Sequence, residues 1–428
     1  MSGAPVGFKG RKKTAIAIAT AALAVAVVGG SGSPATGTGT QPALAPVLFV
    51  GNNWDGTADV IKQGGTQDHP TFTRVARLNI IPDINARMAE IRADPVRLGY
   101  FLAIRQAIGE GHDQFVDDMF TSKDGRLLVV SRPSLADVVG INLNSGRIVW
   151  RFRVDGQRSD HMAISPDGKH IAVSASTGNV VHILDTYTGH EVGRFPSGDS
   201  PHENNYSKDG SKIYHASIGL VYTPADRPQF DTTKGDRRFQ IVNAATNRII
   251  KKIDMGKKLE QAGYPNMSSA VRPMALSPNE RFLYFQVSFF HGFVEYDFAQ
   301  DRVTRVARLP NLVPNMPREQ YLLDSAHHGI AMNPQGTRLC VAGTMDDYAA
   351  IVSRDTFGYK LIQTGGKKPY WVTNSGDGRY CFVSWSGSDR ISAISYGSRE
   401  EVARVPVGDH PQRMRMGVVT QAWLQAHL

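Results

Sequence analysis

The sequence has little cysteine and no long hydrophobic run. Only two of its 428 residues are cysteines, which excludes a disulfide-rich scaffold and a cysteine-rich zinc module. The longest apolar run, Thr14–Val28, is shorter than the about 20 residues that a transmembrane helix needs. Apolar residues still make up 41% of the chain and charged residues 20%, so the sequence predicts a folded protein with a large core.

The sequence also lacks a basic block with interleaved aromatic residues. The formal net charge is +9, but four of the basic residues lie within residues 1–45, which contain no acidic residue, and this leaves +5 for the rest. So small an excess argues against a nucleic-acid partner. The nucleophile elbow, the P-loop, the dinucleotide fingerprint and the His-Glu-x-x-His motif are absent as well, so none of these enzyme classes is predicted.

The first 35 residues have the pattern of an export signal. Basic residues at 9–13 precede the apolar run, and a stretch rich in small residues follows it, with Ser33-Pro34-Ala35 as the expected cleavage site. We predict a signal peptide at 1–35, a linker at 36–46 and a secreted or cell-envelope location. An uncleaved anchor is the alternative, and only in that case would the protein contact a membrane.

A repeat of about 42 residues occupies most of the remaining chain. Its marker is a tight turn of the type Ser-Pro-Asp-Gly, in which proline and glycine set the backbone angles. The turns begin at Ser122, Ser165, Ser207, Ser277, Asn333 and Ser375. A strand flanks each turn on both sides, and a second hairpin follows, so one repeat unit predicts four antiparallel strands.

The repeats predict an all-β fold, a seven-bladed β-propeller with four-stranded blades. The sequence contains six copies of the first hairpin of the repeat and seven copies of the second. The unmatched copy is near the N-terminus, where strands are expected at 48–50, 59–61 and 75–80 without an innermost strand before them. We predict that the strand at 412–419 completes this first blade and closes the ring. The propeller is expected to span 47–420, with a C-terminal tail at 421–428.

Four long insertions interrupt the repeat. Each follows the second or fourth strand of a blade, so all should emerge on one face of the propeller, which favours that face as the binding face. The insertions are 82–113, 220–237, 257–271 and 311–326. Residues 82–108 have helical periodicity, and Asp94-Pro95 marks the start of a second helix. This helical insertion could brace the ring or act as a lid over its mouth.

The strands that follow the turns resemble a known repeat. Ile171–Ser174, Cys381–Ser384 and Val180–Gly189 are similar to the YVTN-type β-propeller repeat, and the resemblance covers nearly everything after residue 46. It implies the propeller fold. The broader group contains lactonase-like propellers, the propeller domain of nitrous oxide reductase and many uncharacterised exported proteins, so the fold by itself implies no activity.

Metal-ligand side chains gather at one register of the repeat, just before the innermost strand of each blade. The symmetry of a propeller should direct them toward the central channel. Six of the 13 histidines fall in these windows. Five of them are the predicted metal ligands: His161, His202, His327, His328 and His410. Imidazole with carboxylate suits several transition metals, and we expect copper or zinc. The copper preference comes from the resemblance to nitrous oxide reductase, which collects a copper cluster with histidines at this place.

Carboxylates, a tyrosine and basic residues accompany the histidines. The predicted catalytic residues are Asp117, Asp160, Glu203 and Tyr370. The residues predicted to bind an anionic small-molecule substrate are Arg272, Lys368 and Arg413. Ion pairs among these acidic and basic groups are the structural alternative.

The sequence therefore favours an exported propeller with a metal-binding small-molecule site, and a metalloenzyme of undefined reaction (oxidoreductase, hydrolase or lyase). The first alternative is a non-catalytic cell-envelope scaffold with a protein partner. It predicts an exposed aromatic patch, to which Tyr222, Phe230 and Tyr264 could contribute. The second alternative is a lactonase-like hydrolase that needs no tightly bound metal.

Cys340 and Cys381 fall at slightly different offsets in consecutive repeats. We interpret them first as buried small apolar residues and second as a disulfide. Both lie in expected strands, which argues against a cysteine nucleophile.

Overall fold

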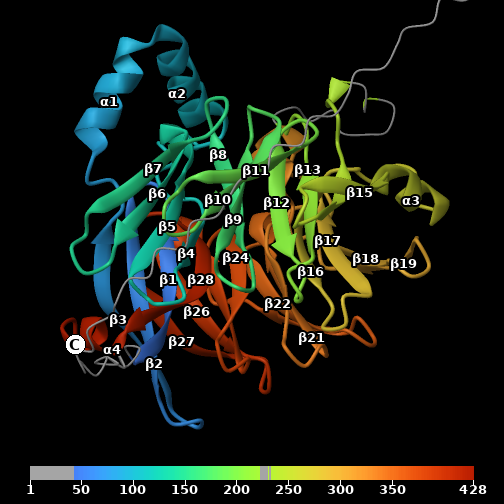
Figure 1. The fold of residues 1–428 in the computed structure, drawn as a ribbon. Coiled ribbons are helices and arrows are strands. Elements are labelled where there is room, and N and C mark those ends of the chain that lie inside the picture. Colours follow the sequence, from blue (N-terminus) through green and yellow to red (C-terminus); the bar gives the residue numbers. More distant parts are fainter. Residues whose placement is uncertain (1–42, 222–229, 231–232) are drawn as a thin grey trace, which may run out of the picture. The chain divides into compact units, whose positions relative to one another are not determined.

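The computed structural model describes residues 43–221, 230 and 233–428, and it forms a ring of seven four-stranded antiparallel sheets (Figure 1). The predicted seven-bladed propeller is confirmed. The predicted signal peptide and most of the predicted linker lie outside the described residues, as does Tyr222. Within the described part of the chain, no helix is long and apolar enough to cross a membrane.

Every blade has the same strand order from the channel outward. The inner strands are β4 (Met119–Thr121), β8 (Ser159–Ile164), β12 (Pro201–Tyr206), β16 (Val271–Leu276), β20 (Ile330–Met332), β24 (Pro369–Asn374) and β28 (Pro411–Thr420). The second strands are β1 (Leu44–Asn52), β5 (Leu127–Arg132), β9 (His170–Ala175), β13 (Lys212–Ser217), β17 (Phe282–Val287), β21 (Arg338–Gly343) and β25 (Tyr380–Trp385).

The third and fourth strands complete the blades toward the rim. The third strands are β2 (Thr57–Gly65), β6 (Asp137–Asn142), β10 (Val180–Asp185), β14 (Phe239–Asn243), β18 (Gly292–Asp297), β22 (Tyr348–Ser353) and β26 (Arg390–Ser395). The fourth strands are β3 (Pro70–Asn79), β7 (Ile148–Arg153), β11 (Glu191–Pro196), β15 (Arg248–Ile253), β19 (Arg302–Arg308), β23 (Tyr359–Ile362) and β27 (Glu401–Pro406). Alternate apolar side chains of adjacent sheets form the core between blades.

The C-terminal strand closes the ring, as predicted. β28 pairs antiparallel with β1, so both ends of the propeller share the first blade. β1 begins three residues before the predicted boundary at 47. The segment 421–428, predicted as a tail, contains helix α4 (Gln421–Gln425). Trp423 and Leu424 of this helix are buried against the core of the first two blades, so the segment is part of the fold.

The recurrent turn motif folds through a serine–aspartate contact. The Ser165 hydroxyl donates to Asp167 Oδ1 (2.6 Å) and accepts from the backbone N–H of His170 (3.0 Å). Gly168 has a φ of 74°, which glycine adopts without strain. The same contact recurs in the turns that begin at Ser122, Ser207 and Ser375. Because the hydrogen bonds that stabilise this turn join residues within the motif, the sequence is sufficient to locate it.

The blades are numbered in chain order, so blade 1 contains β28 and β1–β3, and blade 2 contains β4–β7. The insertion at 82–113 forms a helical hairpin, as predicted, that projects beside blade 2 (Figure 1). Helix α1 spans Ile84–Ala93 and helix α2 spans Pro95–Ala107. The Asp94 carboxylate caps α2 by accepting two backbone N–H groups. A third insertion helix, α3 (Met255–Gln261), lies in the connection from β15 to β16.

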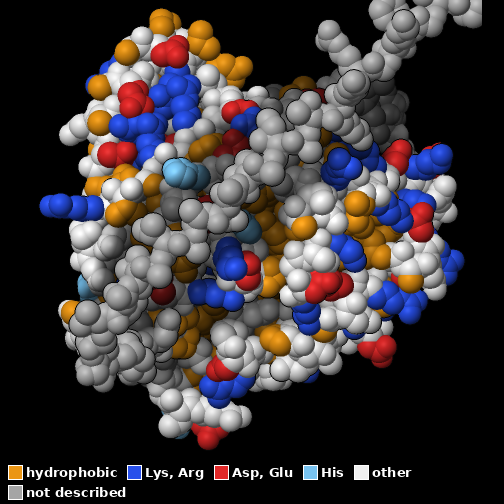
Figure 2. Space-filling view, in the orientation of Figure 1, with side chains coloured by type: hydrophobic (Ala, Val, Ile, Leu, Met, Phe, Trp, Pro, Cys, Tyr) orange, Lys and Arg blue, Asp and Glu red, His pale blue; other side chains and the backbone are white. Residues whose placement is uncertain are grey.

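Apolar and ionic contacts hold the hairpin to blade 2. Ile91 and Phe101 pack on Leu135, which follows β5. Arg132 of β5 is fully buried and pairs with Asp83, just before α1 (Nη1–Oδ1 2.6 Å). Space-filling shows acidic and basic side chains together on this hairpin (Figure 2). These contacts favour a hairpin that braces the ring over a hairpin that acts as a lid.

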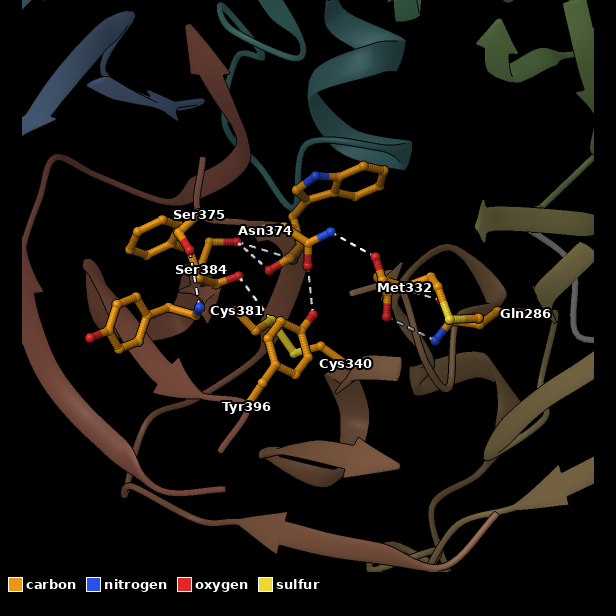
Figure 3. Close-up of a disulfide and its surroundings, with 12 residues drawn as sticks. Gln286, Met332, Cys340, Asn374, Ser375, Cys381, Ser384 and Tyr396 are labelled. Atoms are coloured by element: carbon orange, nitrogen blue, oxygen red, sulfur yellow. Dashed lines mark hydrogen bonds between the residues drawn. A yellow bond between two sulfur atoms is a disulfide. The ribbon is translucent and has the colours of Figure 1, made fainter. Parts of the chain in front are cut away.

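Cys340 and Cys381 form a disulfide, which confirms the second interpretation of this pair; the first, two buried but unpaired cysteines, is wrong about the pairing. The bond joins β21 to β25 across two neighbouring blades, and both residues are fully buried (Figure 3). Asn374 crosses the same boundary by donating to the Met332 carbonyl (2.7 Å). The Cα atoms of the two cysteines are 6.4 Å apart, within disulfide reach. The spacing along the chain misleads here, because this distance depends on how adjacent sheets face each other.

Replacing both cysteines by alanine should lower the free energy of unfolding by about 2–4 kcal/mol, because the bond closes a long loop in the unfolded chain. Guanidinium unfolding of the Cys340→Ala/Cys381→Ala protein measures the loss. Wild type under reducing conditions is the matched control, and its free energy of unfolding should fall by a similar amount. An unchanged unfolding midpoint in both would contradict the expectation.

Candidate metal centre

The inner strands share an irregularity at their first residues. The pairing with the second strand shifts register in five blades, in β8, β12, β16, β24 and β28. In β8 the shift takes Asp160 and His161 out of the regular ladder, and in β12 it does the same for His202 and Glu203. A bulge of this kind bends the strand and redirects its side chains. The repeated irregularity therefore lies at the register where the sequence places the ligand-type residues.

Three of the five predicted metal ligands meet at this level. His161 and His202 come from β8 and β12, and His328 comes from the connection before β20. One ring nitrogen from each lies within 4.8 Å of the other two, and all three side chains are buried. The ring centroids of His161 and His202 are 3.7 Å apart. Asp117 and Asp160 form a second possible ligand group with His161.

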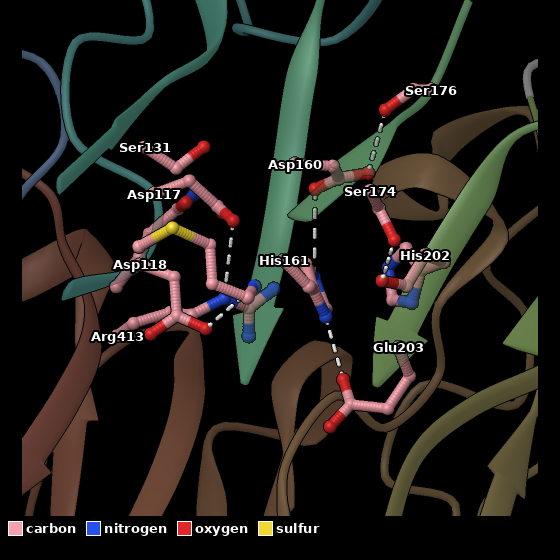
Figure 4. Close-up of polar contacts among 12 residues, drawn as sticks. Asp117, Asp118, Ser131, Asp160, His161, Ser174, Ser176, His202, Glu203 and Arg413 are labelled. Atoms are coloured by element: carbon pink, nitrogen blue, oxygen red, sulfur yellow. Dashed lines mark hydrogen bonds and ion pairs between the residues drawn. The ribbon is translucent and has the colours of Figure 1, made fainter. Parts of the chain in front are cut away.

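Hydrogen bonding around the three histidines fits a metal site. Glu203 Oε2 lies 2.6 Å from His161 Nδ1, and the other ring nitrogen, Nε2, lies 3.7 Å from Asp160 Oδ1 (Figure 4). A carboxylate on the far ring nitrogen is typical of metal-bound histidine. Among the described residues, the buried Nδ1 atoms of His202 and His328 have no hydrogen-bond partner. Such unpaired buried nitrogens require an explanation, and a bound ion supplies one.

Burial keeps the three imidazoles neutral. It lowers the pKa of His161, His202 and His328 well below the usual value. The positive charge of Arg413 adds to this for His161 and His328, and that of Arg272 for His202. Neutral imidazole is the form that binds a metal, so protons compete little at this site.

The carboxylates of the site already have cationic partners. Asp160 Oδ2 accepts from Arg158 Nη1 (2.8 Å), and Asp117 Oδ2 lies 3.3 Å from Arg413 Nε. Burial raises the pKa of Asp117 to about 6 and that of Glu203 to about 8, although Arg413 opposes both shifts. The ion-pair alternative therefore describes Asp117 and Asp160, two of the four predicted catalytic residues.

A small cavity of about 80 Å³ lies beside the histidines. Arg272, Tyr370 and Arg413 line it, which brings two of the predicted substrate-binding residues to the centre. Arg272 is held by the hydroxyls of Ser288 (3.1 Å) and Ser325 (2.8 Å). Arg413 is 1% exposed, and its Nη1 has no hydrogen-bond partner in the part of the chain that the structure describes. Burial raises the pKa of Tyr370 to about 12, so its hydroxyl keeps its proton.

Three other predicted site residues lie away from this group. His327 belongs to a separate cluster between blades 5 and 6. His410 stacks on Trp54, with ring centroids 3.8 Å apart. Lys368 forms an ion pair with Glu110. In an extended chain, consecutive side chains point to opposite sides, so the adjacent pair His327-His328 cannot contribute both rings to one site.

Several cavity-lining residues are missing from the sequence-based set. Arg158 and Gln114 line the cavity, and Arg158 directly precedes β8, two residues before Asp160. A wider window before each inner strand would have included it. The partners of His327 lie in connections between second and third strands, where the repeat shows no distinctive pattern.

No family model matches the chain, and no curated protein matches it either. Among solved structures, it is similar to hydrazine synthase of Kuenenia stuttgartiensis, with a TM-score of 0.54 and 15% sequence identity. The match covers 72% of this chain and 96% of that chain. At this identity the likeness concerns the propeller fold and carries no activity across.

Proposed function

We propose that the protein is an exported metal-binding propeller whose central site takes a small anionic molecule. The observation that carries the proposal is the meeting of His161, His202 and His328 from three blades, with two unpaired buried ring nitrogens. Three neutral imidazoles suit copper or zinc. When bound there, such an ion would supply a Lewis acid or a redox centre.

The protein's own residues would position the ligands. Glu203 orients His161 through its contact with Nδ1 of the ring. Arg413 has an unused guanidinium donor at the cavity, which suits a carboxylate or another small oxyanion. The Tyr370 hydroxyl can donate a hydrogen bond to the same molecule. The cavity volume limits the bound part to a few non-hydrogen atoms.

Export is part of the proposal. The order of basic, apolar and small residues at the N-terminus supports it. The disulfide supports it as well, because such bonds persist in oxidising compartments. We also propose that the chain is a YVTN-type propeller, which its turn motif and strand pattern support.

Metal analysis of the protein, purified without a polyhistidine tag and reconstituted with Cu(II) or Zn(II), tests the central site. The His202→Ala/His328→Ala protein should bind the ion there at least about 100-fold more weakly, because even the loss of a residue that only orients a metal ligand weakens binding by about 10–100-fold. The Glu203→Gln protein should bind the ion about 10–100-fold more weakly than wild type, because Glu203 only orients a metal ligand.

The matched control is His69→Ala/His190→Ala, which removes the same number of histidines from exposed positions. Its affinity should equal that of wild type. Wild type that retains no ion after dialysis, or a His202→Ala/His328→Ala protein that binds as tightly as wild type, would refute the metal-binding function.

An interaction scaffold is the second candidate, and one observation favours it. Helix α2 exposes the large apolar side chains of Val96 (63%), Leu102 (48%) and Tyr100 (45%). Phe230, expected in such a patch, is 39% exposed, whereas Tyr264 is half-buried. Replacing Val96 and Leu102 by serine should abolish capture of a protein partner and leave metal binding intact.

A further inference from the structure

A second group of metal-ligand side chains lies between blades 5 and 6. His291 is in the β17–β18 connection, His327 is in the connection before β20, and Asp346 ends the short 3-10 turn Thr344–Asp346. One ligand atom from each lies within 4.8 Å of the other two. The atoms converge on Asp346 Oδ2, which is 2.6 Å from His291 Nδ1 and 3.1 Å from His327 Nε2.

The group is deeply buried. The side chain of His291 is 9% exposed, and those of His327 and Asp346 are not exposed at all. Among the described residues, Asp346 forms no ion pair with a lysine or arginine, and the two histidines are the titratable side chains in contact with it. Two imidazoles that converge on one buried carboxylate are ligand types that a transition-metal ion binds.

Outer contacts orient two of the three side chains toward one another. The Tyr321 hydroxyl lies 3.0 Å from His291 Nε2, the ring nitrogen that faces away from Asp346. The backbone N–H of Leu312 donates to Asp346 Oδ1 (2.7 Å), the oxygen that faces away from the histidines. This leaves the inner nitrogen of His291 and the inner oxygen of Asp346 directed at the same point, as in metal sites with an ordered second shell.

We infer that His291, His327 and Asp346 hold a divalent transition-metal ion separate from the one proposed for the central site. Two imidazoles and one carboxylate suit Zn(II) or Fe(II), and the Tyr348 hydroxyl, 3.1 Å from His327 Nε2, is the nearest further oxygen donor. Because the three side chains are almost inaccessible to solvent, the ion is structural rather than a site of substrate turnover.

The position of the ion gives it a defined role. Leu312 and Tyr321 belong to the insertion at 311–326, whereas His291 and Asp346 belong to blades 5 and 6. The same insertion supplies the Leu323 carbonyl and the Ser325 hydroxyl that hold Arg272 at the central cavity. An ion at the second site therefore fastens the insertion that positions one wall of the central cavity.

Anomalous X-ray diffraction at the zinc edge, on crystals of the full chain grown with Zn(II), tests this inference. We expect a peak between His291, His327 and Asp346. Absence of a peak there, with the two histidines hydrogen-bonded directly to Asp346, would overturn it. This measurement needs no variant, so a substitution that fails to fold does not affect it.

Metal stoichiometry in solution gives the second readout. Wild type should bind two Zn(II) ions and the Asp346→Asn protein one, with the affinity of the lost site reduced at least about 100-fold. Asp347→Asn is the matched control, because this neighbouring carboxylate pairs with the exposed Lys367 instead. Chelation should lower the melting temperature of wild type and Asp347→Asn more than that of Asp346→Asn.

The metal stoichiometry of the two variants distinguishes failure of the second-site inference from failure of the proposed function. A single ion that is lost in His202→Ala/His328→Ala and kept in Asp346→Asn would overturn the second site and leave the proposed function in place. A single ion lost only in Asp346→Asn would do the reverse.

Discussion

Deletion of residues 411–428 is expected to leave a chain that does not fold as a stable monomer. The deletion removes β28 and α4, so β1 loses its antiparallel partner and the first blade loses its inner strand. Met414, Val419, Trp423 and Leu424 are buried, and removal of one large buried side chain costs about 2–5 kcal/mol. For four such side chains the loss is as large as the about 5–15 kcal/mol by which a typical protein is stable, even before the lost strand pairing is counted.

Circular dichroism and size-exclusion chromatography measure the outcome. The matched control ends at residue 425 and lacks only three exposed residues, so it should fold as wild type does. A synthetic peptide of residues 409–428, added during refolding, should restore part of the structure because it supplies the missing strand. A truncated chain that unfolds at the wild-type denaturant midpoint would show that ring closure contributes little.

Arg132→Met is expected to lower the free energy of unfolding by about 3–5 kcal/mol, since it breaks a buried ion pair. The guanidinium binds Asp137 through two bonds, Nε–Oδ1 and Nη2–Oδ2, both 2.8 Å. It also binds Asp83 and the Ile80 carbonyl, so the same residue fixes the start of the helical hairpin. The variant leaves Asp137 buried, with Arg151 as its remaining cationic partner.

The loss in Arg132→Met should depend on pH. Burial raises the pKa of Asp137 to about 6 even against the opposing charge of Arg132, and loss of that charge raises it further. The folded state then binds a proton more tightly than the unfolded state, whose aspartate pKa is about 3.9. Stability therefore falls as pH rises through the folded pKa, and the variant should recover part of its deficit at pH 5 relative to pH 8.

Urea unfolding at the two pH values tests both parts of this expectation. Arg126→Met is the matched control in the same blade, because Arg126 is 57% exposed and its contact with Asp124 is worth at most about 1 kcal/mol. Adding Asp137→Asn to Arg132→Met should restore stability by removing the uncompensated charge. If Arg132→Met matched Arg126→Met, the anchoring role of the ion pair would be refuted.

The central site was only partly predictable from the sequence. The repeat register identified His161, His202 and His328, because each blade places the same position at the channel. It also included His410, which stacks on Trp54 instead. Register specifies the height of a residue along a strand, whereas the rotamer and the neighbouring blade decide which partner the side chain meets.

The sequence by itself determined the seven blades, the closing strand and the helical hairpin. These features depend on turn residues and on strand and helix periodicity, which act over a few neighbouring positions. Only the tertiary structure decided that Cys340 bonds to Cys381, that Arg132 ties the hairpin to blade 2, and that His327 and His328 serve different clusters. These outcomes depend on distances of a few ångströms between blades, which the packing of sheets sets and no local pattern encodes.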